Sequence, residues 1–116
     1  MKLASRVLVA VALFGAVAWA QDEPKKVTKA EARAAIASMT PPDYPAVARQ
    51  LKIQGAVELN VVVAESGEVV KVEIVSGNAV LTGSASQAVK RWKFKPFLED
   101  GKAIRVLAPI TLDFKL

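Results

Sequence analysis

Alternation of apolar and polar side chains in three stretches constrains the fold of this chain more than any other feature. Residues 56–63 and 69–74 alternate on either side of a Glu-Ser-Gly turn at residues 65–67, and residues 104–114 form a longer third stretch. A period of two places alternate side chains on the same face of a strand. A short turn with glycine favours an antiparallel hairpin. The sequence therefore predicts a small sheet with one buried face.

Two short helices are predicted before the first strand. Residues 28–39 are rich in alanine, and Thr28 and Glu31 occupy the two positions of a capping box. Residues 44–51 follow Asp43, which we expect to be the N-cap of the second helix.

A third helix is predicted between the second and third strands. Ser84 is its expected N-cap, and Pro96 is expected to end it. Its apolar residues recur at i, i+3, i+4 and i+7, which places them on one face. These residues are Ala85, Ala88, Val89 and Trp92.

From residue 42 onward the predicted order is helix, strand, strand, helix, strand. This order predicts an α+β domain in which two helices cover one face of a three-stranded antiparallel sheet. If every strand pair is antiparallel, the third strand must pair with the first, and the spatial order is 2-1-3. The last strand is then an edge strand, and its Pro109 agrees with this because proline has no N–H to donate. An exposed edge can pair with a strand of another chain.

The first 20 residues have the pattern of a secretory signal peptide. Lys2 and Arg6 precede an apolar run that ends with the small residues Ala18 and Ala20. The run is shorter than the roughly 20 residues that a membrane-spanning helix needs. We therefore expect export to the periplasm, with an uncleaved inner-membrane anchor as the alternative. Residues 21–41 are interpreted as a linker that contains the short helix at 28–39.

Two missing residue types exclude several kinds of site. The chain has no cysteine and no histidine, which excludes disulfides and removes the commonest metal ligand and general base. We expect no catalytic residue, metal or cofactor. A net charge of +5 is modest, and the basic residues at 90–95 surround a tryptophan of an apolar stripe. A nucleic-acid partner is therefore not expected.

Several turn and aromatic residues occur in a characteristic order. They are Tyr44-Pro45, the run from Leu51 to Val57, the turn glycine Gly67, the run from Arg91 to Pro96, and Gly101. Together they resemble the C-terminal domain of the TonB energy transducer over residues 42–116. We expect structural roles in turns and core for Tyr44, Pro45, Gly55, Gly67, Trp92, Phe94, Pro96 and Gly101.

The resemblance implies a protein-binding domain. Domains of this family bind a short extended peptide, the TonB box, of an outer-membrane transporter, and the peptide adds as a strand to the last strand of the domain. The resemblance thus implies a part in TonB-dependent transport. It places partner-binding residues in the first helix of the domain and in the last strand: Arg49, Gln50, Val106, Leu107, Ala108, Ile110, Thr111, Leu112 and Asp113.

Two alternatives remain open at this point. Besides the periplasmic peptide-binding domain, they are a shortened, membrane-anchored transducer and an envelope assembly module that forms a homodimer through the same edge, with Val62, Val69 and Leu107 helping to bury it. The family's membrane helix carries a histidine and is followed by a long proline-rich spacer, and this chain has neither. Energy coupling of the usual kind is therefore not expected.

Overall fold

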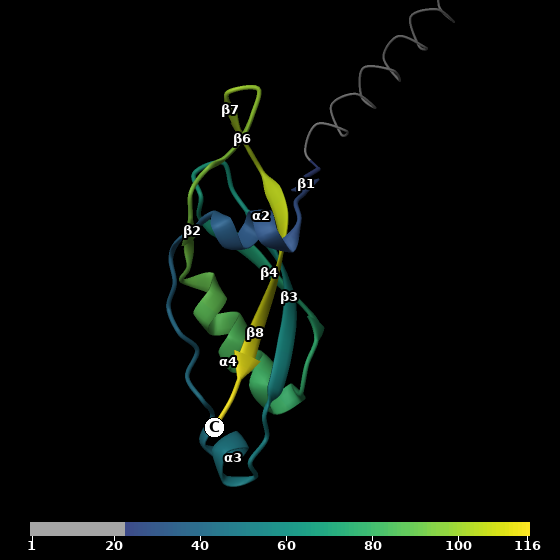
Figure 1. Cartoon of the computed structure of the whole chain (residues 1–116), viewed down its shortest axis with the longest axis vertical. Coiled ribbons are helices and arrows are strands. Elements are labelled where there is room, and N and C mark those ends of the chain that lie inside the picture. Colours follow the sequence, from purple (N-terminus) through teal and green to yellow (C-terminus); the bar gives the residue numbers. More distant parts are fainter. Residues whose placement is uncertain (1–22) are drawn as a thin grey trace, which may run out of the picture.

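The computed structural model describes residues 23–116, which fold into a central sheet with helices around it (Figure 1). The strands are β1 (Lys25–Lys26), β2 (Ile36–Ser38), β3 (Gly55–Val63), β4 (Val69–Ser76), β5 (Lys93–Phe94), β6 (Phe97–Glu99), β7 (Lys102–Ile104) and β8 (Val106–Phe114). The helices are α2 (Lys29–Ala34), α3 (Ala46–Gln50) and α4 (Ala79–Lys90). The predicted signal peptide at 1–20 lies outside the described residues. Within residues 23–116, no helix is long and apolar enough to cross a membrane.

The main sheet has four strands in the order β1-β8-β3-β4. β3 pairs antiparallel with β8 in unbroken register and with β4 through two register shifts. β1 pairs in parallel with β8 at Val106 and Leu107 only. The prediction of a three-stranded, purely antiparallel sheet is therefore wrong in strand number and direction, because β1 adds a fourth, parallel strand outside β8. A two-residue pairing of this kind leaves no recognisable period in the sequence. The three expected strands themselves are neighbours in the order β4-β3-β8, which corresponds to 2-1-3.

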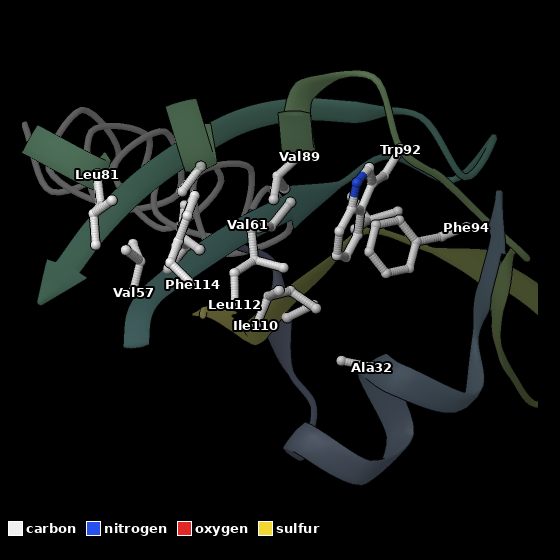
Figure 2. Packing of buried hydrophobic residues seen from close by; sticks show 14 of the residues in the cluster. Ala32, Val57, Val61, Leu81, Val89, Trp92, Phe94, Ile110, Leu112 and Phe114 are labelled. Carbon is white, nitrogen blue, oxygen red and sulfur yellow. The ribbon is translucent and has the colours of Figure 1, made fainter. Parts of the chain in front are cut away.

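The core lies between one face of this sheet and α4 (Figure 2). Alternate residues of β3 and β8 point into it, as the period of two predicts, and full burial of each large aliphatic side chain contributes about 1.5–3 kcal/mol. β3 supplies Val57, Leu59, Val61 and Val63, and β8 supplies Val106, Ala108, Ile110, Leu112 and Phe114. The other side is made by Leu81, Ala85, Ala88, Val89, Trp92 and Phe94.

β4 does not keep the alternation that its sequence predicts. Val69 and Val72 pack against the core, whereas Val70, Ile74 and Val75 are exposed. The register shift between Val62 and Val63 places Val69 rather than Val70 on the core side, because a bulge changes which side chain of the strand faces the core. Ile74 stands opposite the buried Leu59 in regular register, but it lies in an edge strand of the sheet.

The N-cap of α4 lies six residues before the predicted N-cap Ser84. This N-cap is Asn78, whose side-chain oxygen accepts a hydrogen bond from the Val80 N–H at 2.9 Å. Ser84 lies inside the helix, where its hydroxyl donates to the carbonyl oxygen of Asp43. Asp43 in turn is not the N-cap of α3, since that position is held by Pro45.

The segment before the domain forms a short helix and a strand in place of the single helix predicted over 28–39. Both hydrogen bonds of the capping box between Thr28 and Glu31 are present, but α2 ends at Ala34. The carbonyl oxygen of Ala35 accepts a hydrogen bond from the Lys95 N–H at 2.7 Å, and β2 then pairs antiparallel with β5. Bonding to this distant strand replaces the second half of the predicted helix.

α2 also changes the predicted arrangement of two helices on one face. Ala32 of α2 is fully buried in the core cluster, and Figure 2 shows it pointing toward the side chains near Ile110. α2 contacts β8, whereas α3 lies at the end of the sheet where β8 ends (Figure 1). The three helices therefore surround the sheet at different places.

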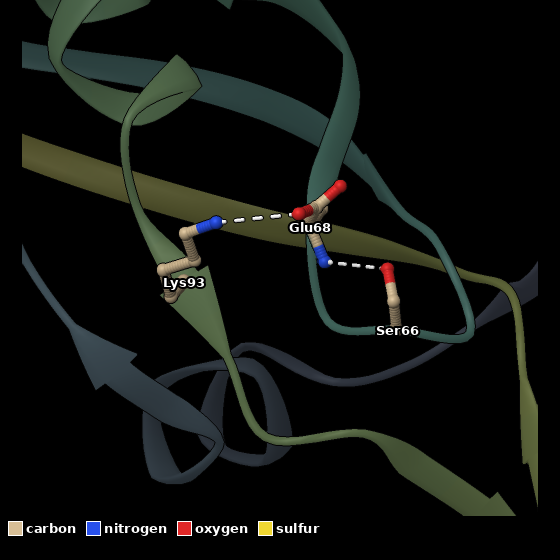
Figure 3. A network of polar contacts seen from close by, with 3 residues as sticks. All are labelled: Ser66, Glu68 and Lys93. Atoms are coloured by element: carbon tan, nitrogen blue, oxygen red, sulfur yellow. Dashed lines mark hydrogen bonds and ion pairs between the residues drawn. The ribbon is translucent and has the colours of Figure 1, made fainter.

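The turn between β3 and β4 is held to β5. Gly67 has φ +90°, and its carbonyl oxygen accepts a hydrogen bond from the Phe94 N–H at 2.9 Å. Lys93 Nζ lies 3.4 Å from a carboxylate oxygen of Glu68, and the backbone N–H of Glu68 donates to the Ser66 hydroxyl (Figure 3). These contacts connect the hairpin to the segment that follows α4.

Candidate functional site

The main chain of β8 is unpaired along most of its outer edge. In an antiparallel pair, residues alternate between those that bond to the neighbouring strand and those that face away from it. The Leu107 carbonyl oxygen accepts a hydrogen bond from the Val27 N–H at 3.1 Å, so Leu107 faces away from β3. Pro109, Thr111 and Asp113 then face the same way, and within the described residues no strand pairs with them.

Pro109 occupies a position where its missing N–H costs the sheet nothing. It stands opposite Asn60 in the register with β3, at a pair whose main-chain groups point away from each other. This agrees with the expectation that proline marks an edge of the sheet.

A groove of about 810 Å³ runs beside this outer edge. Its volume falls in the range of known ligand sites. α2, the segment around β2, Trp92 after the end of α4, and β8 contribute to its walls. The lining residues are Lys29, Ala30, Arg33, Ala34, Ile36, Met39, Trp92, Pro109, Ile110, Thr111 and Leu112.

Trp92 is held firmly in the wall of the groove. Only 2% of the residue is exposed, and its indole N–H donates to the Thr40 carbonyl oxygen at 2.7 Å. Its ring lies 6.4 Å from that of Phe94, centroid to centroid. Burial and a satisfied N–H are what a tryptophan needs in a core, so this wall is rigid and apolar.

Thr111 is the polar residue in the β8 wall. Its hydroxyl oxygen is buried and has no hydrogen-bond partner in the described part of the chain. Thr111 stands opposite Glu58 in the sheet, and Lys29 Nζ lies 3.6 Å from a Glu58 carboxylate oxygen. A buried hydroxyl without a partner is costly, which makes this part of the groove suited to a ligand with polar main-chain groups.

An exposed ion pair connects β1 to β6. Lys25 Nζ donates to a Glu99 carboxylate oxygen at 2.6 Å. This hydrogen bond, and then the charge of Glu99, raise the pKa of Lys25 above its ordinary value. Because both side chains are exposed to solvent, the pair contributes little to stability.

The structure brings only some of the predicted partner-binding residues together. Ile110, Thr111 and Leu112 line the groove. Val106 and Ala108 are buried against the core, Leu107 is paired with β1, and Asp113 is exposed just beyond the groove.

The predicted residues of the first domain helix lie elsewhere. Arg49 and Gln50 belong to α3 and are not among the lining residues. The Arg49 guanidinium stands 5.9 Å above the centre of the Tyr44 ring, which in turn packs edge-on against Phe114 at 5.7 Å. These two residues therefore lie near the C-terminal end of β8, and their part in binding stays a prediction.

Six groove residues that precede the domain were not among the predicted site residues: Lys29, Ala30, Arg33, Ala34, Ile36 and Met39. They belong to the segment interpreted as a linker. Their spacing signals a short helix only, and nothing local indicates that this helix packs beside the last strand.

The expected structural residues lie mainly in turns and core. Trp92 and Phe94 are buried, and Tyr44 packs against the core cluster. The glycines at the three turns all have positive φ: +142° at Gly55, +90° at Gly67 and +79° at Gly101. Within residues 23–116 there is no group of three or more acidic residues placed to hold a metal ion.

Known proteins share both the sequence pattern and the fold. The family described as Gram-negative bacterial TonB protein C-terminal matches residues 40–116. Protein TonB of Vibrio cholerae is 33% identical over 85 residues, which are 72% of this chain and 35% of that protein. Protein tonB2 of Pseudomonas aeruginosa is 38% identical over 77 residues, which are 65% of this chain and 28% of that protein. The chain thus spans about a third of the length of these curated relatives.

Two solved structures have a similar fold. The solution NMR structure of the Pseudomonas aeruginosa TonB CTD has a TM-score of 0.59 and 24% identity, over 70% of this chain and 84% of that one. The tonb2 protein from Vibrio anguillarum has a TM-score of 0.51 and 30% identity, over 68% and 82% of the two chains. Because the family match extends over residues 40–116, well over half of the sequence, this chain belongs to the family of Gram-negative bacterial TonB protein C-terminal domains.

Proposed function

We propose that this protein is a periplasmic binding protein that captures an extended peptide of an outer-membrane TonB-dependent transporter. The peptide adds as a strand to the outer edge of β8. The observation that carries the proposal is the unpaired main chain at Thr111 and Asp113, beside an apolar groove. Membership of the TonB C-terminal family supports the choice of partner.

Strand addition would use both the unpaired main chain of this edge and the groove beside it. An added strand lies about 4.8 Å from its neighbour, and its side chains alternate between two faces. The N–H and C=O groups of Thr111 and Asp113 would supply main-chain hydrogen bonds, each worth a net 0.5–1.5 kcal/mol or so. Alternate side chains of the peptide would enter the groove against Trp92, Ile110 and Leu112. Main-chain bonds then give affinity, and the groove gives selectivity.

NMR titration with synthetic TonB-box peptides tests the proposal. With ¹⁵N-labelled protein, we expect the largest shifts at the amides of Thr111 and Asp113, and little change along β4 on the far side of β3. Shifts confined to other parts of the molecule, or no shifts, would contradict strand addition to β8. If the edge instead binds a second copy of the chain, the same amides shift with protein concentration in the absence of peptide.

A matched pair of variants at Thr111 separates the main chain from the side chain. Thr111→Pro removes the outward N–H at a position where an edge tolerates proline, and we expect at least a tenfold loss of peptide affinity. Thr111→Ala keeps this N–H and removes only the hydroxyl, so it measures the contribution of the side chain, and we expect its loss of affinity to be clearly smaller than that of Thr111→Pro. Equal affinities for the two variants would show that the peptide does not pair with this edge.

The proposed location depends on residues 1–20. We propose cleavage after Ala20 and release into the periplasm, and N-terminal sequencing of the protein from cell fractions tests this. A chain that begins at Gln21 in the periplasmic fraction agrees with release. A chain that keeps residues 1–20 in the membrane fraction supports the anchored alternative.

A further inference from the structure

α2 forms one wall of the groove although it precedes the part of the chain that the family matches. Residues 29–34 come before position 40, where the family match begins. The helix is nevertheless fixed in place by its capping box and by the fully buried Ala32. Figure 2 shows Ala32 directed toward the core. This wall is therefore a feature of this chain in addition to the family domain.

The charge of the groove comes entirely from α2. Lys29 and Arg33 are the only charged residues among the described residues that line it, and none of the lining residues is acidic. The Glu58 carboxylate partly balances Lys29 at 3.6 Å. Arg33 forms no ion pair within residues 23–116.

The rest of the lining is apolar apart from Thr111. Ile36, Trp92, Ile110 and Leu112 supply the largest apolar side chains. A segment that fills such a groove gains affinity from apolar side chains, but these do not distinguish one apolar peptide from another. The two cations of α2 add a preference that depends on charge, because an opposite charge beside them is favoured and a like charge is not.

We propose that α2 selects the partner segment: the groove prefers an extended peptide that places an acidic side chain beside Arg33 and apolar side chains against Trp92 and Ile110. This inference rests on the proposed strand addition and deepens it. The planar guanidinium of Arg33 can bind a carboxylate through two parallel hydrogen bonds. Lys29 is already engaged with Glu58, so Arg33 is the main determinant.

Arg33 also has a possible structural role, which the experiment must separate from recognition. It lies in the last turn of α2, where a positive charge favours the helix dipole. A purely structural role would change the binding of charged and neutral peptides equally. A recognition role changes the difference between them.

The probes are capped hexapeptides that alternate valine and threonine. The two peptides of the first pair differ only at the first position, where one has glutamate and the other glutamine. The two peptides of the second pair differ in the same way at the last position, because the peptide can bind in either direction. Affinities are measured by NMR titration of the protein. For at least one pair we expect the glutamate peptide to bind about two- to fivefold more tightly, as for an exposed ion pair. The preference should decrease strongly in 1 M NaCl.

Three variants complete the test. Arg33→Gln should abolish the preference for glutamate, whereas Arg33→Lys, which keeps the charge but loses the planar fork, should keep part of it. Arg91→Gln makes the same change of charge at an exposed position after α4 that does not line the groove, and it should keep the preference in full. The amide signal of Ala32 in each variant reports whether α2 is still packed.

The possible failures are distinguishable. Equal affinity of the unchanged protein for both members of each pair overturns the role of α2 but leaves strand addition intact. A loss of affinity for both members in Arg33→Gln, with the preference unchanged, also overturns it and indicates a structural role. If neither these peptides nor TonB-box peptides bind, the proposed function fails and this inference fails with it.

Discussion

At the scale of single residues, Gly67 shows how a distant part of the chain restricts one backbone position. Its φ of +90° is unfavourable for other residues, and an added Cβ would collide with the carbonyl group of Phe94. The Phe94 N–H also donates to the Gly67 carbonyl oxygen, so the turn cannot easily move away. Glycine is therefore required at this position both by the positive φ and by the close approach of Phe94.

Substitution of two glycines should have opposite effects on stability. Gly67→Ala is expected to lower the free energy of unfolding by about 2–4 kcal/mol, through backbone strain and the clash with Phe94. Gly83→Ala is the control, because its Cβ would meet no atom within 4 Å and it lies within α4. Alanine should raise stability there by about 0.5–1 kcal/mol. Urea unfolding measures both, and a Gly67→Ala protein as stable as the unchanged one would contradict the steric argument.

At the scale of elements, α2 is the most informative, because local and distant contacts both determine it. The capping box of Thr28 and Glu31 starts it, and the pairing of β2 with β5 stops it. A helix of six residues is not stable by itself in water. Tertiary contacts must therefore supply the rest of its stability, and they include the burial of Ala32 in the core and the packing of α2 against β8.

Loss of the cap should release this element. Thr28→Ala removes the side-chain oxygen that accepts from the Glu31 N–H at 3.1 Å, and we expect a loss of about 1 kcal/mol. Hydrogen exchange at the Ala32 and Ala35 amides should accelerate. Thr82→Ala is the control: its hydroxyl bonds only to the Ala79 carbonyl of its own helix, so stability should change by less than about 0.5 kcal/mol. Equal losses in the two variants would show that the capping box does not hold α2.

At the scale of the whole molecule, stability depends on the single core between the sheet and α4. Leu59 lies in the central strand β3 and is 1% exposed, whereas Leu98 in the β6–β7 hairpin is 67% exposed. Leu59→Ala should lower the free energy of unfolding by about 2–5 kcal/mol because it leaves a cavity. Leu98→Ala should change it by less than about 0.5 kcal/mol. Thermal or urea unfolding compares them, and similar midpoints would contradict a core centred on β3.

Much of the fold could be predicted because its signals are local. β3 and β8 follow from a period of two, the hairpin from its glycine turn, and the capping box from two residues three positions apart. The position of Pro109 indicated an unpaired edge, and Ile110, Thr111 and Leu112 of the candidate site lie on that strand. Each of these inferences depends on neighbours in the sequence, which act on the backbone wherever the segment lies.

Other features depend on partners far along the chain and have no local signal. β1 is a strand only because β8 lies beside it, and the helix predicted to reach residue 39 ends early because Ala35 bonds to Lys95. The same long-range packing brings Lys29 and Arg33 to the groove. Sequence alone therefore defined β3, β4 and β8, the buried faces of β3 and β8, and the outer edge of β8. The three-dimensional packing placed α2 beside that edge, where it forms a second wall of the groove and supplies its positive charge. Contacts of this kind between distant segments form only when the chain has folded.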